Sequence, residues 1–240
     1  MDFSKRIALV TGAGKGIGQA VAQLLVERHA DTVILSDINP ETLNDTRKAL
    51  EGRGTKIDAY VCDVSKEAAV NEMMEAVLKK HGRVDILINN AGIYNTWVLF
   101  CESSSDQWKQ KMEVNVYGTM YCTRALLPQM LEQKYGRIVN IGSVAGIYGL
   151  RHMVDYSASK GAVIAFTKAL AKEVAPYGVT VNSVSPGGIH PDPSQNRALS
   201  FMERSGSPRE CAELIVFLAS DEASYISGQD HQADGCRRGM

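Results

Sequence analysis

The sequence lacks an excess of either charge, a long apolar segment and any paired cysteine motif. Its 26 basic and 27 acidic residues leave a net charge of −1, so no strong field is available to collect nucleic acid or an anionic membrane surface. No apolar run approaches the roughly 18 residues of a membrane span, and the run at 7–10 is too short for the core of a signal peptide. We therefore expect neither nucleic acid nor membrane as a partner, and a cytoplasmic location.

The cysteines and histidines lack the spacings that are typical of disulfide frameworks and metal sites. The cysteines are odd in number and form no CxxC pair; they are Cys62, Cys101, Cys122, Cys211 and Cys236. The histidines likewise show no ligand spacing to one another or to cysteine. The pattern predicts reduced thiols in a cytoplasmic protein, no disulfide framework and no metal site.

The sequence does contain a repeated alternation of short apolar runs with longer helical patterns. Its 240 residues are a length typical of one domain. The runs are rich in valine and isoleucine, as expected for strands covered on both faces; they are 6–10, 32–36, 57–64, 84–90, 136–143 and 179–187. Such alternation implies right-handed crossovers. We therefore predict an α/β fold over 1–240: a single-domain Rossmann-type doubly wound parallel sheet with helices on both faces.

A glycine-rich segment, 11–18, lies between the first predicted strand and the first predicted helix. It reads TGAGKGIG and fits TGxxxGxG through Gly12, Gly16 and Gly18, whereas Ile17 stands where the generic GxGxxG has its last glycine. Glycine permits a tight turn and a close approach to pyrophosphate, and the next helix offers its free N–H groups to phosphates. For so loose a motif alone, a purely structural glycine turn is the alternative.

Asp37 ends the second predicted strand, nineteen residues after Gly18. An acid at this place in a dinucleotide-binding unit meets the hydroxyls of the adenosine ribose, although an aspartate after a strand is also a common turn residue. Loop, strand and acid together favour dinucleotide binding. Because a 2′-phosphate would meet a like charge at Asp37, NAD(H) is the predicted cofactor and NADP(H) the alternative.

Tyr156 and Lys160 are four residues apart in a segment with helical apolar spacing, so both side chains project from one face. A free tyrosine has a pKa near 10, and a neighbouring ammonium lowers that pKa because it favours the phenolate. Ser143 ends a predicted strand thirteen positions earlier, at the strand end where open α/β sheets bind ligands. The three residues predict proton transfer to a substrate oxygen, whereas a lone YxxxK is more often a surface pair.

In these features the sequence resembles the classical short-chain dehydrogenase/reductase family over nearly its whole length. The matching motifs occur in the family's order: TGAGKGIG at 11–18, Asp63-Val64, Asn89 to Gly92, Asn115, Ser143, Tyr156-x-x-x-Lys160 and Pro186-Gly187. GRIVNIGSVAG and SGQDHQADG are closest in style to the 3-oxoacyl-carrier-protein reductases of this family. The resemblance implies an oxidoreductase that moves a hydride between a nicotinamide and a secondary alcohol or ketone, with 3-oxoacyl thioesters among the candidates.

The resemblance also implies a role for each motif. Tyr156 would be the acid/base, Ser143 would orient the substrate oxygen, Lys160 would lower the pKa of the tyrosine and bind the nicotinamide ribose, and Asn115 would position a water in the proton relay. The implied cofactor-binding residues are Gly12, Lys15, Gly16, Ile17, Gly18, Asp37, Asp63, Val64, Asn89, Ala91, Gly92, Tyr156, Lys160, Pro186, Gly187 and Ile189. A basic residue at Lys15 often accompanies NADP(H) in the family, but one exposed lysine contributes little against Asp37.

Three departures from the family pattern bear on the substrate. Pro191 stands where a threonine usually contacts the nicotinamide carboxamide, the segment from Pro191 to Gly206 is shorter than the usual substrate lid, and Cys236 replaces a customary glycine. Because a short, proline-restricted lid covers less of the site, we expect an open entrance suited to bulky or carrier-linked ketones. A simply mobile polar loop is the alternative.

Other functions and assemblies remain open at this point. Hydroxysteroid, polyol or other ring-alcohol dehydrogenase activity is the alternative within the same chemistry, and a non-catalytic dinucleotide sensor is the alternative of another class. The complete set of four catalytic residues argues against the sensor. The resemblance further implies a homodimer or homotetramer formed through the helices predicted at 104–134 and 156–175, unless their apolar residues all face the sheet.

Overall fold

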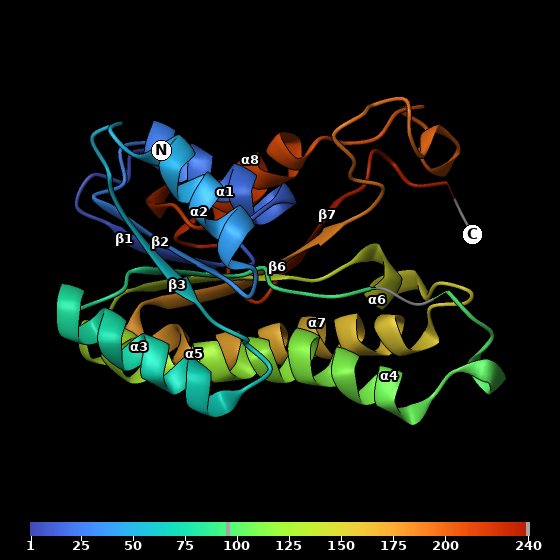
Figure 1. Ribbon diagram of the computed structural model, residues 1–240, viewed down its shortest axis with the longest axis horizontal. Coiled ribbons are helices and arrows are strands. Elements are labelled where there is room, and N and C mark those ends of the chain that lie inside the picture. Colours follow the sequence, from blue (N-terminus) through green and yellow to red (C-terminus); the bar gives the residue numbers. More distant parts are fainter. Residues whose placement is uncertain (95–96, 239–240) are drawn as a thin grey trace.

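The computed structural model describes residues 1–94 and 97–238, in which a parallel sheet lies between two layers of helices (Figure 1). The strand order is β3-β2-β1-β4-β5-β6-β7, and every pairing is parallel. The strands are β1 (Ile7–Thr11), β2 (Thr32–Asp37), β3 (Lys56–Val61), β4 (Ile86–Asn89), β5 (Gly136–Ile141), β6 (Val179–Pro186) and β7 (Asp230–Ala233). The chain order reverses direction between β1 and β4, and this switch point is where such sheets bind ligands beyond their carboxyl ends.

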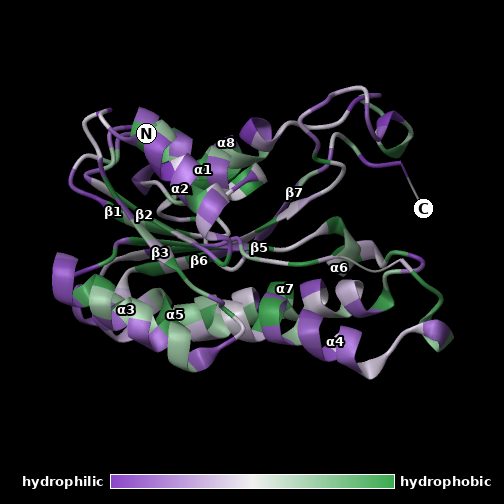
Figure 2. Cartoon of the chain, in the orientation of Figure 1, coloured by the Kyte–Doolittle hydropathy of each residue, from purple (hydrophilic) through white to green (hydrophobic). Residues whose placement is uncertain are grey.

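The helices cover both faces of the sheet. One layer contains α1 (Gly16–Glu27), α2 (Pro40–Leu50) and α8 (Pro208–Leu218); the other contains α3 (Glu67–His81), α4 (Ser105–Lys111), α5 (Gly118–Glu132) and α7 (Val154–Val174), with the short α6 (Val144–Tyr148) beside α7. Short 3₁₀ turns occupy Phe100–Glu102, Ala175–Tyr177, Arg197–Leu199 and Asp221–Ala223. Each layer packs its own apolar cluster against the sheet, and Figure 2 shows hydrophobic residues along the central strands and hydrophilic ones on α4. The predicted doubly wound fold is confirmed.

Three elements differ from the sequence-based prediction. The segment 104–134, predicted as one long helix, consists of α4, a π-helical turn at Met112–Tyr117 and α5. The strand β7 was not predicted, because its residues DHQA carry no apolar run; it pairs with the end of β6, and Asp230 accepts hydrogen bonds from Ser183 and Ser185 of that strand. The edge strand β3 is also only half-buried, unlike the fully covered strands the pattern predicted.

The amino ends of β1 and β5 are held by a charged cluster of Arg6, Tyr135, Arg137 and Asp221. Both guanidinium carbons lie over the Tyr135 ring, 3.9 Å and 4.3 Å from its centroid. Both arginines also pair with Asp221, at 2.8 Å and 3.0 Å, and the Tyr135 hydroxyl donates to the same carboxylate. Because each member of the cluster has several partners, the cluster fixes the starts of β1 and β5 to Asp221 and stabilises this end of the sheet.

Candidate active site

The glycine-rich loop at the end of β1 is shaped by close backbone approaches. Gly12 and Gly16 have φ angles of +63° and +60°, which other residues rarely adopt. A Cβ on Gly12 would lie 2.8 Å from Asn90 Nδ2, and one on Gly18 would lie 2.2 Å from the Gly12 oxygen. Around Gly16, by contrast, no atom from outside its own stretch of backbone lies within 4 Å of the Cβ position. The loop is therefore packed against β4 on one side and open on the other.

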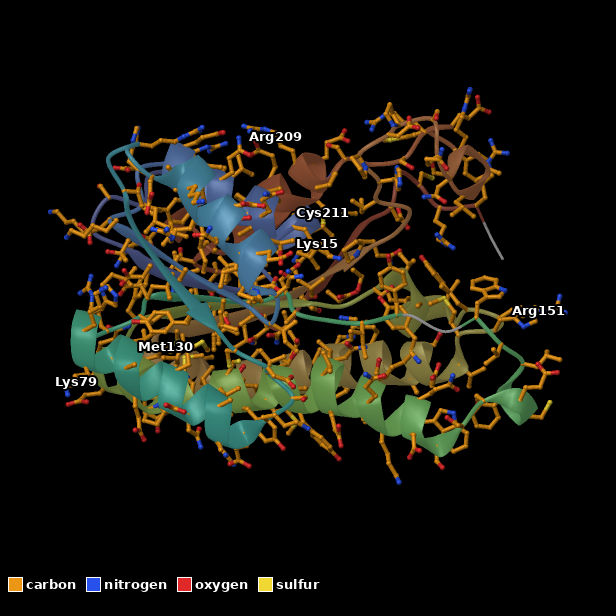
Figure 3. All side chains as sticks on the ribbon, in the orientation of Figure 1. Lys15, Lys79, Met130, Arg151, Arg209 and Cys211 are labelled. Carbon is orange, nitrogen blue, oxygen red and sulfur yellow. The ribbon has the colours of Figure 1, made fainter. Side chains whose placement is uncertain are left out.

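The N-terminus of α1 fits a diphosphate. Its N-cap residue, Lys15, makes no side-chain cap, and the first turn contains no acidic residue. Figure 3 places Lys15 beside the start of this helix, and its side chain is exposed. Uncapped N–H groups and the positive end of the helix dipole attract phosphate. Ile17 is partly buried against the core below α1, so it anchors the loop from within.

The carboxylate of Asp37 is fixed over this loop at the end of β2. Its Oδ2 accepts a hydrogen bond from Gly14 N at 2.8 Å, and its Oδ1 accepts one from Asn39 N at 2.9 Å. A Cβ on Gly14 would lie 2.9 Å from that Oδ2. The sequence predicted a role for Asp37 but not its hydrogen bond with Gly14. This bond holds the negative charge of the carboxylate beside the glycine-rich loop.

The residues at the end of β4 and just after it make hydrogen bonds that hold the neighbouring elements together. The Asn89 side chain is buried and donates to Thr123 Oγ1 and Asn140 Oδ1, so it ties β4 to α5 and β5. Asn90, which lies within the predicted motif from Asn89 to Gly92, donates to the backbone oxygens of Thr11 and Gly12, and Ala91 N donates to Thr11 Oγ1. The Asn89 side chain therefore serves the scaffold, while Asn90 and Ala91 hold the glycine-rich loop against β4.

The residues that follow β3 lie near the same edge. Asp63 Oδ1 accepts a hydrogen bond from Ser65 N. Val64 is buried against the start of α5, where a Cβ on Gly118 would lie 2.8 Å from it. The backbone of the preceding Cys62 donates to the Asp37 oxygen, which connects this loop to the end of β2.

Three of the four predicted catalytic residues follow β5: Ser143 lies just after the strand, and Tyr156 and Lys160 lie in the first two turns of α7. Ser143 caps α6, and its Oγ accepts a hydrogen bond from Ala145 N. Helix α6 packs closely on α7 at Gly146, where a Cβ would lie only 2.6 Å from the Gly161 nitrogen. Lys160 donates from Nζ to the Ile141 oxygen at 2.7 Å and lies 6.0 Å from the centroid of the Tyr156 ring. The carboxyl end of β5 therefore receives all three side chains.

The fourth residue, Asn115, enters from the π-helical turn. It is fully buried; its Oδ1 accepts from Ile93 N, and its Nδ2 donates to the Ile93 oxygen and to Ser159 Oγ. A Cβ on Gly92 would lie 3.2 Å from Asn115 Oδ1 and 3.4 Å from Lys160 Nζ. Gly92 thus borders both residues, and the absence of its side chain leaves space between them.

Burial governs the electrostatics of this group. Burial raises the pKa of Tyr156, and a hydrogen bond with Ser143 opposes that rise; neighbouring Tyr94, whose ring contacts it edge-on at 6.3 Å, raises it further. Burial also lowers the pKa of Lys160 to about 8. The pKa of Tyr156 is therefore raised by burial, whereas the sequence had predicted that Lys160 would lower it.

Pro186, Gly187 and Ile189 lie where β6 leads into the lid. Gly187 and Ile189 border a pocket of about 330 Å³ whose remaining lining comes from Met202, Arg204, Gly206, Glu210, Cys211 and 232–236. None of the four predicted catalytic residues lines this pocket. The lid is held at its stem by the His190 N to Gly206 O bond, and Phe201 N and Arg238 N bond to the backbone oxygens of Cys236 and Leu199. These contacts favour an ordered lid over a simply mobile loop.

The chain resembles known proteins along nearly all its length. The family model of short chain dehydrogenases matches residues 6–199. The 3-oxoacyl-[acyl-carrier-protein] reductase of Thermotoga maritima is 40% identical, with 98% of each chain covered, and the Vibrio harveyi protein of the same name is also 40% identical, with 98% coverage. Among solved structures, a NAD⁺-bound xylitol dehydrogenase has a TM-score of 0.92 and 31% identity, covering 98% of this chain and 100% of its own. ElxO with NADP bound has a TM-score of 0.89 and 30% identity, covering 96% and 97%.

The fold and these matches define a nicotinamide-dependent oxidoreductase that acts on CH–OH groups and ketones. The chain belongs to the short-chain dehydrogenase family. Within residues 1–94 and 97–238, no three metal-ligating side chains gather into a possible metal site. Over the same residues, no helix combines the length and the apolar content needed to cross a bilayer.

Proposed function

We propose that the chain reduces a 3-oxoacyl thioester to the 3-hydroxyacyl product, with Asn115, Ser143, Tyr156 and Lys160 as its catalytic group. The observation that carries this proposal is that these residues meet at the carboxyl edge of the sheet: Gly92 borders Asn115 and Lys160, Lys160 lies 6.0 Å from the centroid of the Tyr156 ring, and Tyr156 shares a hydrogen bond with Ser143. The 40% identity to 3-oxoacyl-[acyl-carrier-protein] reductases over 98% of each chain supports the substrate class.

The proposed division of labour follows from the side chains. A substrate oxygen held by the hydroxyls of Ser143 and Tyr156 is oriented, and the negative charge that develops on it is stabilised. Tyr156 gives its proton to that oxygen, and the Lys160 ammonium stabilises the phenolate that remains. Asn115, whose amide is held by Ile93 and Ser159, positions the water through which the proton is replaced. When bound, the nicotinamide supplies the hydride.

The proposed cofactor is NAD(H). The carboxylate of Asp37, fixed by Gly14 N and Asn39 N, is available to accept hydrogen bonds from both adenosine ribose hydroxyls, and a 2′-phosphate would meet its charge. Lys15 favours the opposite choice, but it is exposed and screened by solvent. The ratio of kcat/KM for NADH to that for NADPH should exceed 10 and should fall in Asp37→Ala, whereas a wild-type preference for NADPH would show that Lys15 outweighs Asp37.

A polyol or ring alcohol is the second candidate substrate, favoured by the TM-score of 0.92 to a xylitol dehydrogenase. Initial rates with NADH and acetoacetyl-coenzyme A, acetoin, xylulose and a 3-oxosteroid separate the candidates. We expect the thioester to have the highest kcat/KM, at least tenfold above acetoin. If acetoin is best, the open entrance expected from the short lid is wrong; if xylulose or the steroid is best, the second candidate is correct.

The assembly we propose is a homodimer or homotetramer. Of the apolar residues on the two helical segments, Val116, Val163 and Leu170 are buried within the protomer, so they do not support an interface. Tyr117 and Met120, by contrast, expose 44% and 40% of their surface, just before α5 and in its first turn respectively. Sedimentation at micromolar concentration should give a dimer or tetramer, and a monomer would contradict the assembly.

A cytoplasmic location also remains a proposal. All five cysteines are free thiols, and three of them, Cys62, Cys122 and Cys211, are buried. Free thiols persist in a reducing compartment, which supports this location. Fractionation of cells that express the protein at its native level tests it directly, since recovery in a membrane or secreted fraction would contradict the proposal.

A further inference from the structure

A buried ion pair that the proposed mechanism does not use lies next to Tyr156 in the sequence. Lys111 Nζ is 2.8 Å from Asp155 Oδ2, and the two side chains are only 1% and 9% exposed. Removing two charges from water is costly, and such pairs often contribute little net stability. Its burial beside an acid/base residue therefore suggests a role other than stability.

The ion pair is one of two parallel links between the same pair of helical segments. Lys111 ends α4 and Asn115 lies in the π-helical turn that follows, while Asp155 and Ser159 lie in the first turns of α7. Lys111 pairs with Asp155, and Asn115 donates to Ser159 at 3.0 Å. Residues four apart share a helix face, so the ion pair lies one turn from the contact that holds Asn115.

Asp155 also connects the ion pair to the backbone of Tyr156. Its second oxygen, Oδ1, accepts a hydrogen bond from Tyr156 N at 2.8 Å. This bond is needed because α7 starts without a side-chain cap from its N-cap residue, Met153, and Tyr156 is only the third residue of the helix. First turns have unsatisfied N–H groups and open easily. A carboxylate stabilises the turn, and the buried carboxylate is neutralised by Lys111.

We propose that Lys111 and Asp155 are positioning residues, which hold the first turn of α7 against the Asn115 segment so that the Tyr156 phenol stays beside Ser143 and Lys160. The inference rests on the proposed role of Tyr156 as acid/base. Neither residue needs to touch substrate or cofactor. Asp155 acts on the site through its hydrogen bond with the Tyr156 backbone. Lys111 acts through the helical segment that it shares with Asn115.

The test uses the double variant Lys111→Met/Asp155→Asn, which leaves no unpaired buried charge and retains an acceptor for Tyr156 N. With saturating NADH and ketone, we expect kcat to fall at least tenfold, while the Kd of NADH, from its fluorescence, changes less than twofold. Arg137→Met is the matched control, because it removes a buried cation at the other end of the sheet; it should lower Tm and leave kcat unchanged.

A second readout does not depend on turnover. Ultraviolet titration of the ligand-free protein, with Tyr156→Phe as the reference to subtract, isolates the Tyr156 phenol. Loosening the first turn exposes the phenol, so its pKa should move down toward the ordinary value of about 10 in the double variant and stay unchanged in Arg137→Met. A double variant with kcat within twofold of wild type, or with an unchanged phenol titration, would overturn the inference. A wild-type chain inactive on every ketone would instead contradict the proposed function, while the titration would still test the positioning.

Discussion

The two ends of the parallel sheet are built for opposite purposes. At the amino end, Arg6, Arg137, Tyr135 and Asp221 give one another ion pairs, ring contacts and hydrogen bonds. At the carboxyl end, the N-terminus of α1 is uncapped by side chains, and Lys160 is buried with a pKa lowered to about 8. The contacts at the amino end stabilise the fold. At the carboxyl end, the free N–H groups of α1 and the buried Lys160 ammonium are left to interact with a ligand. Substitutions at the two ends should therefore separate stability from activity.

The largest effect is expected at Tyr156. Replacing it with Phe removes the proton donor, so kcat should fall about 10³-fold, within the range of general acid catalysis. Binding of NADH, followed by its fluorescence, should persist, because the ring and the phosphate loop remain. Tyr94→Phe is the matched control, since it keeps the edge-on ring contact with Tyr156 and should retain turnover. Near-normal turnover in Tyr156→Phe would contradict the assignment.

Lys160→Met should lose activity and gain stability. Burial lowers the lysine pKa from 10.5 to about 8 in the folded protein, which at 1.4 kcal/mol per pKa unit destabilises the fold by about 3 kcal/mol. The lost bond to the Ile141 oxygen offsets about 1 kcal/mol of the gain. The penalty is complete below pH 8 and disappears as pH rises through 10.5, because the unfolded chain binds the extra proton in that interval. The variant should therefore be about 2 kcal/mol more stable at pH 7.

Denaturant unfolding of wild type and Lys160→Met at pH 7 and at pH 10 checks both the gain and its sign. The difference between the two proteins should shrink at the higher pH. If the variant is less stable at pH 7, or if the difference in the free energy of unfolding grows with pH, burial of the Lys160 charge does not destabilise the fold.

Arg137→Met should produce the reverse of Lys160→Met. The Arg137 side chain is 7% exposed, pairs with Asp221 and donates to the Gly136 and Gly178 oxygens. Its loss should lower the free energy of unfolding by about 2 kcal/mol, because buried acceptors lose their partner. The kcat of the folded variant should match wild type, as measured after confirming its circular dichroism. A large fall in kcat would mean that the two ends of the sheet are coupled.

The same contrast explains what the sequence could and could not predict. Six strands were predicted because buried parallel strands require continuous apolar runs, as in β1 and β4, while β7 is held by pairing with β6 and by Asp230. The glycine loop, Asp37, Ser143, Tyr156 and Lys160 were recognisable because their spacing along the chain is short. The Lys111–Asp155 pair and the Asn115–Ser159 bond join residues 44 positions apart, and no local pattern marks such partners. The π-helical turn was missed because its sequence fits an ordinary helix.

The smallest expected effect concerns Cys236, which stands where the family resemblance predicts a glycine. Its φ angle is +58°, in the left-handed region where a side chain costs about 1–2 kcal/mol. Cys236→Gly relieves that strain but makes the unfolded chain more flexible, which returns about 0.4–1 kcal/mol. The net gain in the free energy of unfolding should be about 0.5 kcal/mol, measured by denaturant unfolding. Cys236→Ala is the control, because it removes the thiol and keeps the Cβ, and it should show no gain. Equal stabilisation by Ala and Gly would assign the effect to the thiol and contradict the backbone explanation.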